Sequence, residues 1–312
     1  MSVLTRRALI GPVAALLLLA ACQPAGESPG ASTGTESSGP SQGAAGSPVA
    51  EVPAEQLTVA GHLTACIDIP YPPQEFFDDE GNPTGADPDL TTEIAKRLGL
   101  GTRIENTVFD TIIPALIAGK CDIIVSAQNI TTDRLGQVNM IPYFQAGQAF
   151  VVAKGNPAGI KEELDLCGKK AAAETGTTEV DYVNGTGDYE GAGLNKKCAD
   201  AGKAAVDMKE FQKDSDALLA LSGGQVDAYF ADSPVAGYYT VQQPEQFELS
   251  GVTVEIALEG ISVPKDRAEL GDAIVTALKS MIDDGKYLEI LSKYGLEDGA
   301  VKADEVEVQT GS

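Results

Sequence analysis

The sequence predicts an α/β fold in which a mostly parallel sheet is flanked by helices. Short apolar segments with strand character alternate with segments whose apolar residues recur at helical spacing. This alternation is typical of parallel sheets covered by helices on both faces. The chain has 312 residues, which is enough for two compact lobes beyond a targeting segment and a tail.

The alternation is clearest in the first ordered part of the chain. A buried strand is expected at residues 63–69, followed by a loop at residues 71–83 that is rich in proline and glycine. Asp87 is expected to cap a helix that has Pro88 in its first turn and ends at Gly99. The other expected elements are strands at 103–106, 121–125, 171–173 and 226–232, helices at 110–119, 267–283 and 287–294, helix starts near Thr131 and after Thr178, and an acidic C-terminal tail.

The net charge excludes some classes of partner. The formal charge is −24, with 46 acidic and 22 basic residues. Nucleic-acid binding requires a basic face, so no nucleic-acid partner is expected. Protein charge would not hold this chain on an anionic membrane either. The simplest interpretation is a solubilising surface, which could also steer a cationic ligand.

The N-terminus has the pattern of an export signal. Arg6 and Arg7 precede an apolar run of 14 residues at 8–21, which is too short to span a bilayer comfortably. The small residues before Cys22 resemble the bacterial lipobox, which implies a signal peptide at 1–21 and a lipid on Cys22. The alternative is an ordinary signal peptide with an incidental cysteine. Two acyl signals would anchor the protein at the extracytoplasmic face of the cell membrane.

The segment after Cys22 is expected to be a flexible tether that extends to residue 55. Of the 28 residues at 23–50, 23 are Gly, Ser, Pro, Ala or Thr. No apolar face recurs there, so this segment cannot build a core.

The remaining four cysteines are expected to form disulfides. An exported chain with four cysteines allows three pairings. Cys167 and Cys198 lie in segments flanked by lysine and glycine and are expected to be joined. Cys66 and Cys121 lie in strands that could be neighbours, so a second bridge is conceivable. A metal site is not expected, because no CxxC spacing occurs and His62 is the one histidine.

Nothing in the sequence indicates catalysis or a cofactor. There is no Gly-x-Ser-x-Gly elbow, P-loop or dinucleotide fingerprint. The acid pair Asp78-Asp79 lies in a turn and is interpreted as a solvated loop.

Three stretches could hold a zwitterion. Residues 126–134 begin at the carboxyl end of a strand, and an arginine such as Arg134 matches a carboxylate with two parallel hydrogen bonds. Residues 176–178 lie between a strand and a helix, where backbone N–H groups can face an anion. Asp232 ends a strand and would meet a cation. The alternatives are a surface arginine and a helix cap before Pro234.

In this order, the stretches resemble the amino-acid-binding cluster of type 2 periplasmic binding proteins, which include the histidine, lysine/arginine/ornithine and glutamine binders. The likeness runs from about Gly61 to Leu296. The matching stretches are residues 68–73, 84–90, 112–119, 130–134, 176–178 and 228–232.

The resemblance implies a fold of two lobes joined by a two-strand hinge. Lobe 1 would comprise residues 56–145 and 259–312, and lobe 2 residues 146–258. Each lobe would contain a mostly parallel sheet flanked by helices.

The resemblance also implies a role for each site residue. Arg134 would clamp the α-carboxylate of the ligand, together with the backbone N–H groups of Asn129 and Thr178. Asp232 would receive the α-amino group, together with the carbonyl of Ala127.

The side chain of the ligand would lie between Tyr71 and Phe109. Asp68 and Glu174 would contact its far end and favour a basic amino acid over glutamate, while glutamine remains an alternative. Ser126 and Thr177 complete the expected set.

We therefore expect a monomeric, non-enzymatic receptor that delivers an amino acid to the permease subunits of an ABC importer. One alternative is a dehydratase of a cyclic amino-acid precursor, with a raised-pKa acid such as Glu174. Another is a sensory receptor for a membrane signalling partner.

Overall fold

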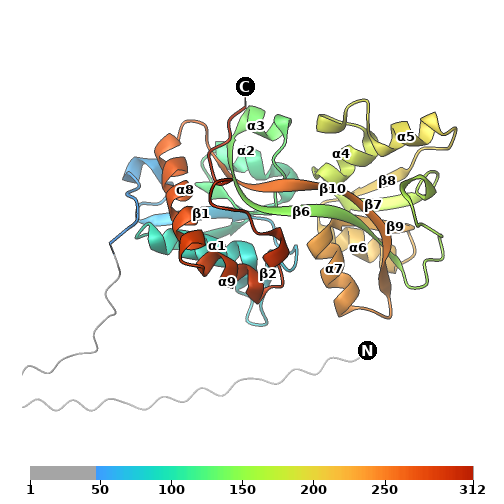
Figure 1. Ribbon diagram of the computed structural model, residues 1–312, viewed down its shortest axis with the longest axis horizontal. Coiled ribbons are helices and arrows are strands. Elements are labelled where there is room, and N and C mark those ends of the chain that lie inside the picture. Colours follow the sequence, from blue (N-terminus) through green and yellow to red (C-terminus); the bar gives the residue numbers. More distant parts are fainter. Residues whose placement is uncertain (1–46, 312) are drawn as a thin grey trace, which may run out of the picture. The chain divides into compact units, whose positions relative to one another are not determined.

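The computed structural model describes residues 47–311 (Figure 1). The expected signal peptide and the expected lipid site at Cys22 lie outside these residues. Of the expected tether, the last part is packed against the folded body: the backbone N–H of Val49 donates to the carbonyl of Arg97 at 2.9 Å, and Val52 contacts the core. Ordered structure therefore begins before the expected position near Gln56, because Ala50 and Val52 are partly buried against the core.

The strands of the described residues form one continuous mixed sheet of eight strands, in the order β4-β1-β5-β10-β6-β9-β7-β8. Two short strands, β2 and β3, form a separate pair. The bounds are β1 His62–Ile67, β2 Phe76–Phe77, β3 Pro83–Thr84, β4 Gly101–Asn106, β5 Ile123–Ile124, β6 Asn139–Ala153, β7 Lys170–Glu174, β8 Asp207–Phe211, β9 Ala228–Asp232 and β10 Phe247–Val263.

Helices flank this sheet. Among the described residues, none is long and apolar enough to cross a bilayer. The bounds are α1 Ala86–Arg97, α2 Ile112–Ile117, α3 Thr132–Gln137, α4 Thr178–Asn184, α5 Leu194–Asp200, α6 Asp214–Ser222, α7 Ser233–Gln242, α8 Ala268–Asp283 and α9 Lys286–Lys293, with short 3-10 turns at Ala54–Gln56, Phe109–Thr111, Glu163–Asp165, Gly187–Tyr189 and Glu297–Gly299.

Two long strands connect two groups of elements. β6 and β10 pair antiparallel along their length, with register shifts that bend the ribbon. Figure 1 shows β1, α1–α3, α8 and α9 on one side, which we call lobe 1, and β7–β9 with α4–α7 on the other, which we call lobe 2. Within each lobe the shorter strands pair in parallel, β1 with β4 and β5, and β7 with β8 and β9. The predicted two-lobed α/β fold is confirmed, while the exact lobe boundaries remain a prediction.

Each lobe has apolar cores of its own. In lobe 1, Leu63 of β1 packs in one cluster with Ile94 of α1 and Ile274 of α8, and all three are fully buried. In lobe 2, the rings of Phe150 and Phe230 stack with their centroids 3.8 Å apart. Separate cores allow each lobe to stay rigid while the strands between them bend.

The expected helix cap at Asp87 is wrong. The helix begins two residues earlier, at Ala86, and its N-cap is Gly85. The φ of +124° at Gly85 suits only glycine, and the missing Cβ leaves room for the carbonyl oxygen of Gln74. Asp87 is buried in the first turn and accepts hydrogen bonds from the Tyr143 hydroxyl at 2.8 Å and the Ala127 N–H at 3.1 Å. It supports the interior of lobe 1 rather than capping the helix.

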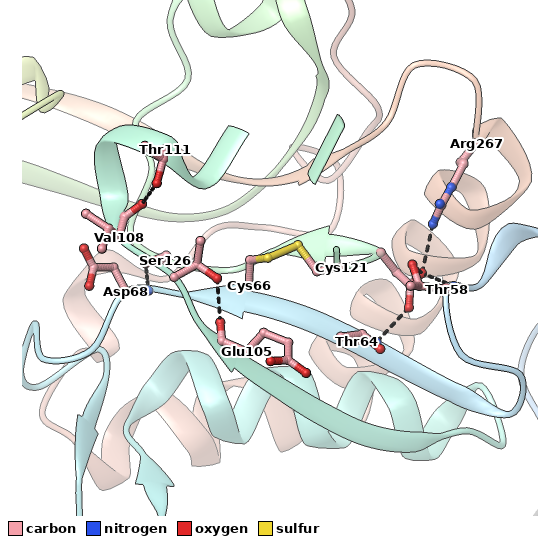
Figure 2. Close-up of a disulfide and its surroundings, with 12 residues drawn as sticks. Thr58, Thr64, Cys66, Asp68, Glu105, Val108, Thr111, Cys121, Ser126 and Arg267 are labelled. Carbon is pink, nitrogen blue, oxygen red and sulfur yellow. Dashed lines mark hydrogen bonds and ion pairs between the residues drawn. A yellow bond between two sulfur atoms is a disulfide. The ribbon is translucent and has the colours of Figure 1, made fainter. Parts of the chain in front are cut away.

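The expected Cys167–Cys198 disulfide is present, and so is the Cys66–Cys121 bridge that the sequence left open. Cys167 is joined to Cys198 in lobe 2, and Cys66 of β1 is joined to Cys121, two residues before β5. Figure 2 shows the second bridge beside β1. The neighbouring Asp122 accepts hydrogen bonds from the backbone N–H of Thr64 at 2.8 Å and from Arg267 at 2.9 Å. This part of lobe 1 is therefore fixed by covalent and polar contacts together.

Candidate functional site

A small cavity lies between the two lobes. The ends of β1, β7 and β9 lead into it, as the rule for ligand sites at the carboxyl ends of strands predicts. All the site residues expected from the sequence line this one cavity: Asp68, Tyr71, Phe109, Ser126, Ala127, Asn129, Arg134, Glu174, Thr177, Thr178 and Asp232. Glu75 and Glu179 also line it and were not predicted.

Arg134 presents a buried guanidinium to the cavity. It lies in α3, whose N-cap Thr131 accepts a hydrogen bond from the Arg134 N–H at 3.2 Å. The guanidinium donates to the carbonyl of Asn129 at 2.8 Å and, across the lobes, to the carbonyl of Gly176 at 3.1 Å. Its central carbon lies 5.4 Å from the centre of the Phe109 ring.

The side chain of Arg134 has no ion pair with any carboxylate in residues 47–311. Burial lowers its pKa, while the charges of Glu179 and other nearby acids oppose this effect. A buried guanidinium with free hydrogen-bonding capacity is suited to bind an anion such as a carboxylate.

Asp232 ends β9 and presents a carboxylate from the other lobe. One oxygen, Oδ2, accepts a hydrogen bond from the Tyr71 hydroxyl at 3.0 Å. The other oxygen, Oδ1, is buried and has no hydrogen-bond partner within the described chain. Burial raises the pKa of Asp232 well above its usual range, and repulsion by Glu179 adds to this. A cation placed beside Oδ1 would satisfy it and favour its ionised form.

Asp68 and Glu174 form an acidic end of the cavity. Asp68 follows β1 and accepts a hydrogen bond from the Phe109 N–H at 2.7 Å, while Glu174 ends β7. Their carboxyl groups are hydrogen-bonded to each other across the lobes. Burial, followed by the charges of Asp68 and Asp214, raises the pKa of Glu174 to about 10.

Hydrogen bonds between polar side chains join the two lobes beside the cavity. The Thr178 hydroxyl, at the start of α4 in lobe 2, donates to the side-chain oxygen of Asn129 in lobe 1 at 2.7 Å. Gln148 of β6 donates to the same hydroxyl at 2.7 Å. The side-chain nitrogen of Asn129 is buried and has no partner within residues 47–311. Asn129 therefore has N–H donors available for a bound group.

The two unpredicted lining residues are both acids. Glu179 follows Thr178 in the first turn of α4, and burial raises its pKa to about 7 although Arg134 lowers it. Glu75 accepts a hydrogen bond from Ser126 at 2.7 Å and is hydrogen-bonded to the buried Asp87 behind it. Proximity to Thr178 could have indicated Glu179, but no local pattern marks Glu75, which lies in an irregular loop.

The arrangement of charges suits a ligand with both signs of charge. One guanidinium, that of Arg134, and five carboxyl groups line the cavity. No group of three or more histidine, cysteine, aspartate or glutamate side chains in the part of the chain described here could hold a metal ion.

The chain matches a known protein family. The model for the bacterial extracellular solute-binding proteins of family 3 matches residues 63–297. The chain is 29% identical over 256 residues to the arginine-binding protein ArgT of Corynebacterium glutamicum, with 81% of each chain covered. It is 32% identical over 234 residues to a probable histidine-binding protein of Campylobacter jejuni, which covers 73% of this chain and 82% of that protein.

Solved structures give the same result. An ancestral arginine-binding protein bound to arginine matches with a TM-score of 0.67 and 38% identity, over 75% of this chain and 98% of that one. An ancestral arginine-binding protein bound to glutamine matches with a TM-score of 0.67 and 37% identity, over 76% of this chain and 99% of that one. An ancestral amino-acid-binding protein, described as a precursor of cyclohexadienyl dehydratase, matches with a TM-score of 0.66 and 32% identity, over 75% of this chain and 95% of that one.

Proposed function

Because this chain belongs to the bacterial extracellular solute-binding proteins of family 3, we propose that it captures an amino acid between its lobes and delivers it to an ABC importer. The observation that carries this proposal is the pair of unsatisfied groups in the cavity. The buried guanidinium of Arg134 has no carboxylate partner among the described residues, and Oδ1 of Asp232 has no donor there. The two ends of an amino-acid backbone supply the missing partners.

In the proposed complex, Arg134 binds the α-carboxylate and Asp232 binds the α-amino group. Asn129 and Thr178 lie beside Arg134 and contribute hydrogen bonds. Closure of the lobes removes water from both charged contacts, and this strengthens them. The aromatic rings of Tyr71 and Phe109 enclose the aliphatic part of the ligand side chain.

We propose that the ligand is a basic amino acid, with arginine as the first candidate. Asp68 and Glu174 are both buried and acidic, and they lie at the end of the cavity that the ligand side chain would reach. The names of the relatives that bind arginine support this choice. Glutamine is the second candidate, because an amide N–H can donate to a carboxyl group and an ancestral arginine-binding protein was solved with glutamine bound.

The proposal does not include catalysis. The family and the curated relatives named above are binding proteins. The high pKa of Glu174 would suit a general acid, and the dehydratase precursor shares the fold, but that precursor is itself described as an amino-acid-binding protein. Turnover of prephenate or arogenate by the purified protein would contradict a purely binding role.

A thermal-shift screen against the twenty amino acids tests the proposed function directly. A ligand that binds only the folded protein stabilises it by about 2.7 kcal/mol at a concentration of 100 Kd. We expect arginine to raise the melting temperature more than any other amino acid. The proposal would be wrong if none of the twenty produced a shift at millimolar concentration.

We further propose that a lipid on Cys22 holds the protein at the outer face of the cell membrane as a monomer. Small residues precede Cys22, and a segment rich in Gly, Ser and Pro follows it. Fractionation of expressing bacteria tests the anchor. The Cys22→Ser variant should move from the membrane fraction to the soluble fraction, whereas Ser41→Ala should stay with the membrane.

A further inference from the structure

Asp68 and Glu174 meet across the lobes in a contact that requires a proton. Both side chains are 7% exposed, and both line the cavity. Their carboxyl groups are hydrogen-bonded to each other. An ionised carboxylate only accepts hydrogen bonds, so two ionised groups cannot make this contact. One of the two therefore carries a proton whenever this contact is made.

The surroundings of the pair do not supply a replacement for that proton. Lys213, which is exposed, and Asp110 are the charged groups that act on Asp68 besides Glu174. Asp214 acts on Glu174 and repels its ionised form. Neither acid of the pair has an ion pair with a lysine or arginine in residues 47–311.

The rest of the cavity is also acidic. Glu75, Glu179 and Asp232 share it with Arg134 as the one lining cation. Arg134 is not one of the main charges that act on Asp68 or Glu174, and its guanidinium donates to the carbonyls of Asn129 and Gly176.

We propose that the Asp68–Glu174 pair selects between ligands by exchanging a proton for the charge of the ligand side chain. When the ligand ends in a neutral group, the closed pair keeps one proton between its carboxyl groups. When the ligand ends in a guanidinium or ammonium group, that group supplies the positive charge and the N–H donors, and the proton leaves to solvent. This inference rests on the proposed function, because it concerns the far end of the same ligand.

The consequence is a selectivity that depends on pH. A complex with a cationic ligand holds one proton fewer than a complex with a neutral ligand of the same shape. By linkage, the ratio of the two association constants rises about tenfold per pH unit while this difference lasts. Burial raises the pKa of Glu174 to about 10. A neutral ligand end adds no charge that would lower this pKa, so we expect the difference to extend through neutral pH.

This ratio does not depend on the ligand-free state. Open and closed unliganded forms are common to both binding reactions and cancel. The titration of other cavity acids, such as Glu75 and Glu179, changes the association constants of both ligands by the same factor, so it cancels from their ratio. The comparison therefore isolates the pair.

Calorimetry with arginine and citrulline tests the proposal. Citrulline has nearly the same shape as arginine but ends in a neutral ureido group. For the full-length protein, we expect the affinity ratio of arginine to citrulline to rise about 100-fold between pH 6 and pH 8. Repeating the titrations at pH 7 in two buffers of different ionisation enthalpy should show a difference of about one bound proton between the ligands.

Glu174→Gln and Glu210→Gln form a matched pair of variants. An amide at position 174 can donate to Asp68 without a titrating proton, so the affinity ratio should become independent of pH. Glu210 lies on the adjacent strand β8 and is exposed, so its replacement should leave the 100-fold change intact. If Glu174→Gln does not fold, Asp68→Asn provides the same test from the other lobe.

The outcomes separate this inference from the proposed function. Arginine binding with a ratio that stays constant from pH 6 to pH 8 overturns the proton exchange and leaves the receptor proposal standing. Arginine binding without any binding of citrulline or glutamine at pH 6 also overturns it, because a protonated pair should accept a neutral end. If no amino acid binds at any pH, the proposed function itself is wrong.

Discussion

The hydroxyl of Tyr71 makes two hydrogen bonds to Asp232, which lies 161 residues away in the sequence. It donates to Oδ2 of Asp232 at 3.0 Å and accepts from the backbone N–H of Asp232 at 2.9 Å. Tyr71 follows β1 in lobe 1, whereas Asp232 ends β9 in lobe 2. Separation of the lobes must break both bonds, so this contact reports on closure.

Tyr71→Phe should weaken ligand binding while it keeps the aromatic ring. The variant leaves the buried N–H of Asp232 without its partner in the closed form, and an unsatisfied buried group costs about 1–3 kcal/mol. We expect the affinity for arginine to fall by roughly 5- to 150-fold, as measured by calorimetry. The control is Tyr238→Phe in α7, a half-buried tyrosine of lobe 2 outside the cavity. Equal affinities of Tyr71→Phe and the wild type would contradict the role given to this contact.

Arg134→Ala should have a larger effect on affinity. Removal of one partner from a buried charge pair leaves the other charge uncompensated and costs about 2–5 kcal/mol. The affinity for arginine should therefore fall by a factor of about 30 to several thousand. The matched control is Arg103→Ala on β4, whose side chain is 49% exposed. Near-wild-type affinity of Arg134→Ala would remove the carboxylate clamp from the proposal.

The sequence predicted the parallel sheet from its local pattern, and the two lobes and most of the residues that line the cavity from its resemblance to a known family. Regular alternation of strands and helices predicts a mostly parallel sheet from local pattern alone. The cavity residues were assigned through resemblance in short motifs, such as the one that ends at Arg134. These motifs lie at strand ends and helix starts, where the fold brings distant parts of the chain together.

The sequence could not reveal the buried acids behind the cavity. Asp87 followed by Pro88 has the local pattern of a helix cap, and only the tertiary contact with Tyr143 shows its actual role. Glu259 lies in β10, fully buried, and accepts a hydrogen bond from Gln74 at 2.6 Å. A carboxylate in a strand is normally expected to face solvent. Long-range packing alone determines that it faces inward.

The Cys167–Cys198 disulfide should stabilise lobe 2 without affecting the ligand site. It closes a loop with a sequence separation of 31 and joins α5 to the segment before β7. The expected loss on its removal is about 2–4 kcal/mol, which corresponds to roughly 4–16 °C for a protein of this size. Thermal unfolding of the double variant Cys167→Ala/Cys198→Ala would measure this loss. The affinity for arginine should be unchanged at a temperature where the variant is folded, and a large loss of affinity there would contradict this separation.

The buried carboxyl of Asp214 should make the ligand-free protein more stable in mildly acidic than in alkaline solution. Asp214 begins α6 and accepts hydrogen bonds from the hydroxyls of Tyr229 and Tyr239. Burial raises its pKa to about 7 from its ordinary value of 3.8. Between these two values the folded protein holds a proton that the unfolded chain has released. The contribution of Asp214 to the free energy of unfolding is therefore fully present below about pH 4, and it is lost as the pH rises to about 7.

Melting temperatures of the ligand-free protein at pH 5.5 and pH 8 test this assignment. We expect the higher value at pH 5.5, with Glu179 contributing in the same direction because burial raises its pKa to about 7 as well. Asp214→Asn removes the titrating group and should reduce the difference between the two pH values. Asp216→Asn, on the exposed face of the same helix, should retain it. A wild-type melting temperature that is higher at pH 8 would show that the folded protein does not hold these protons.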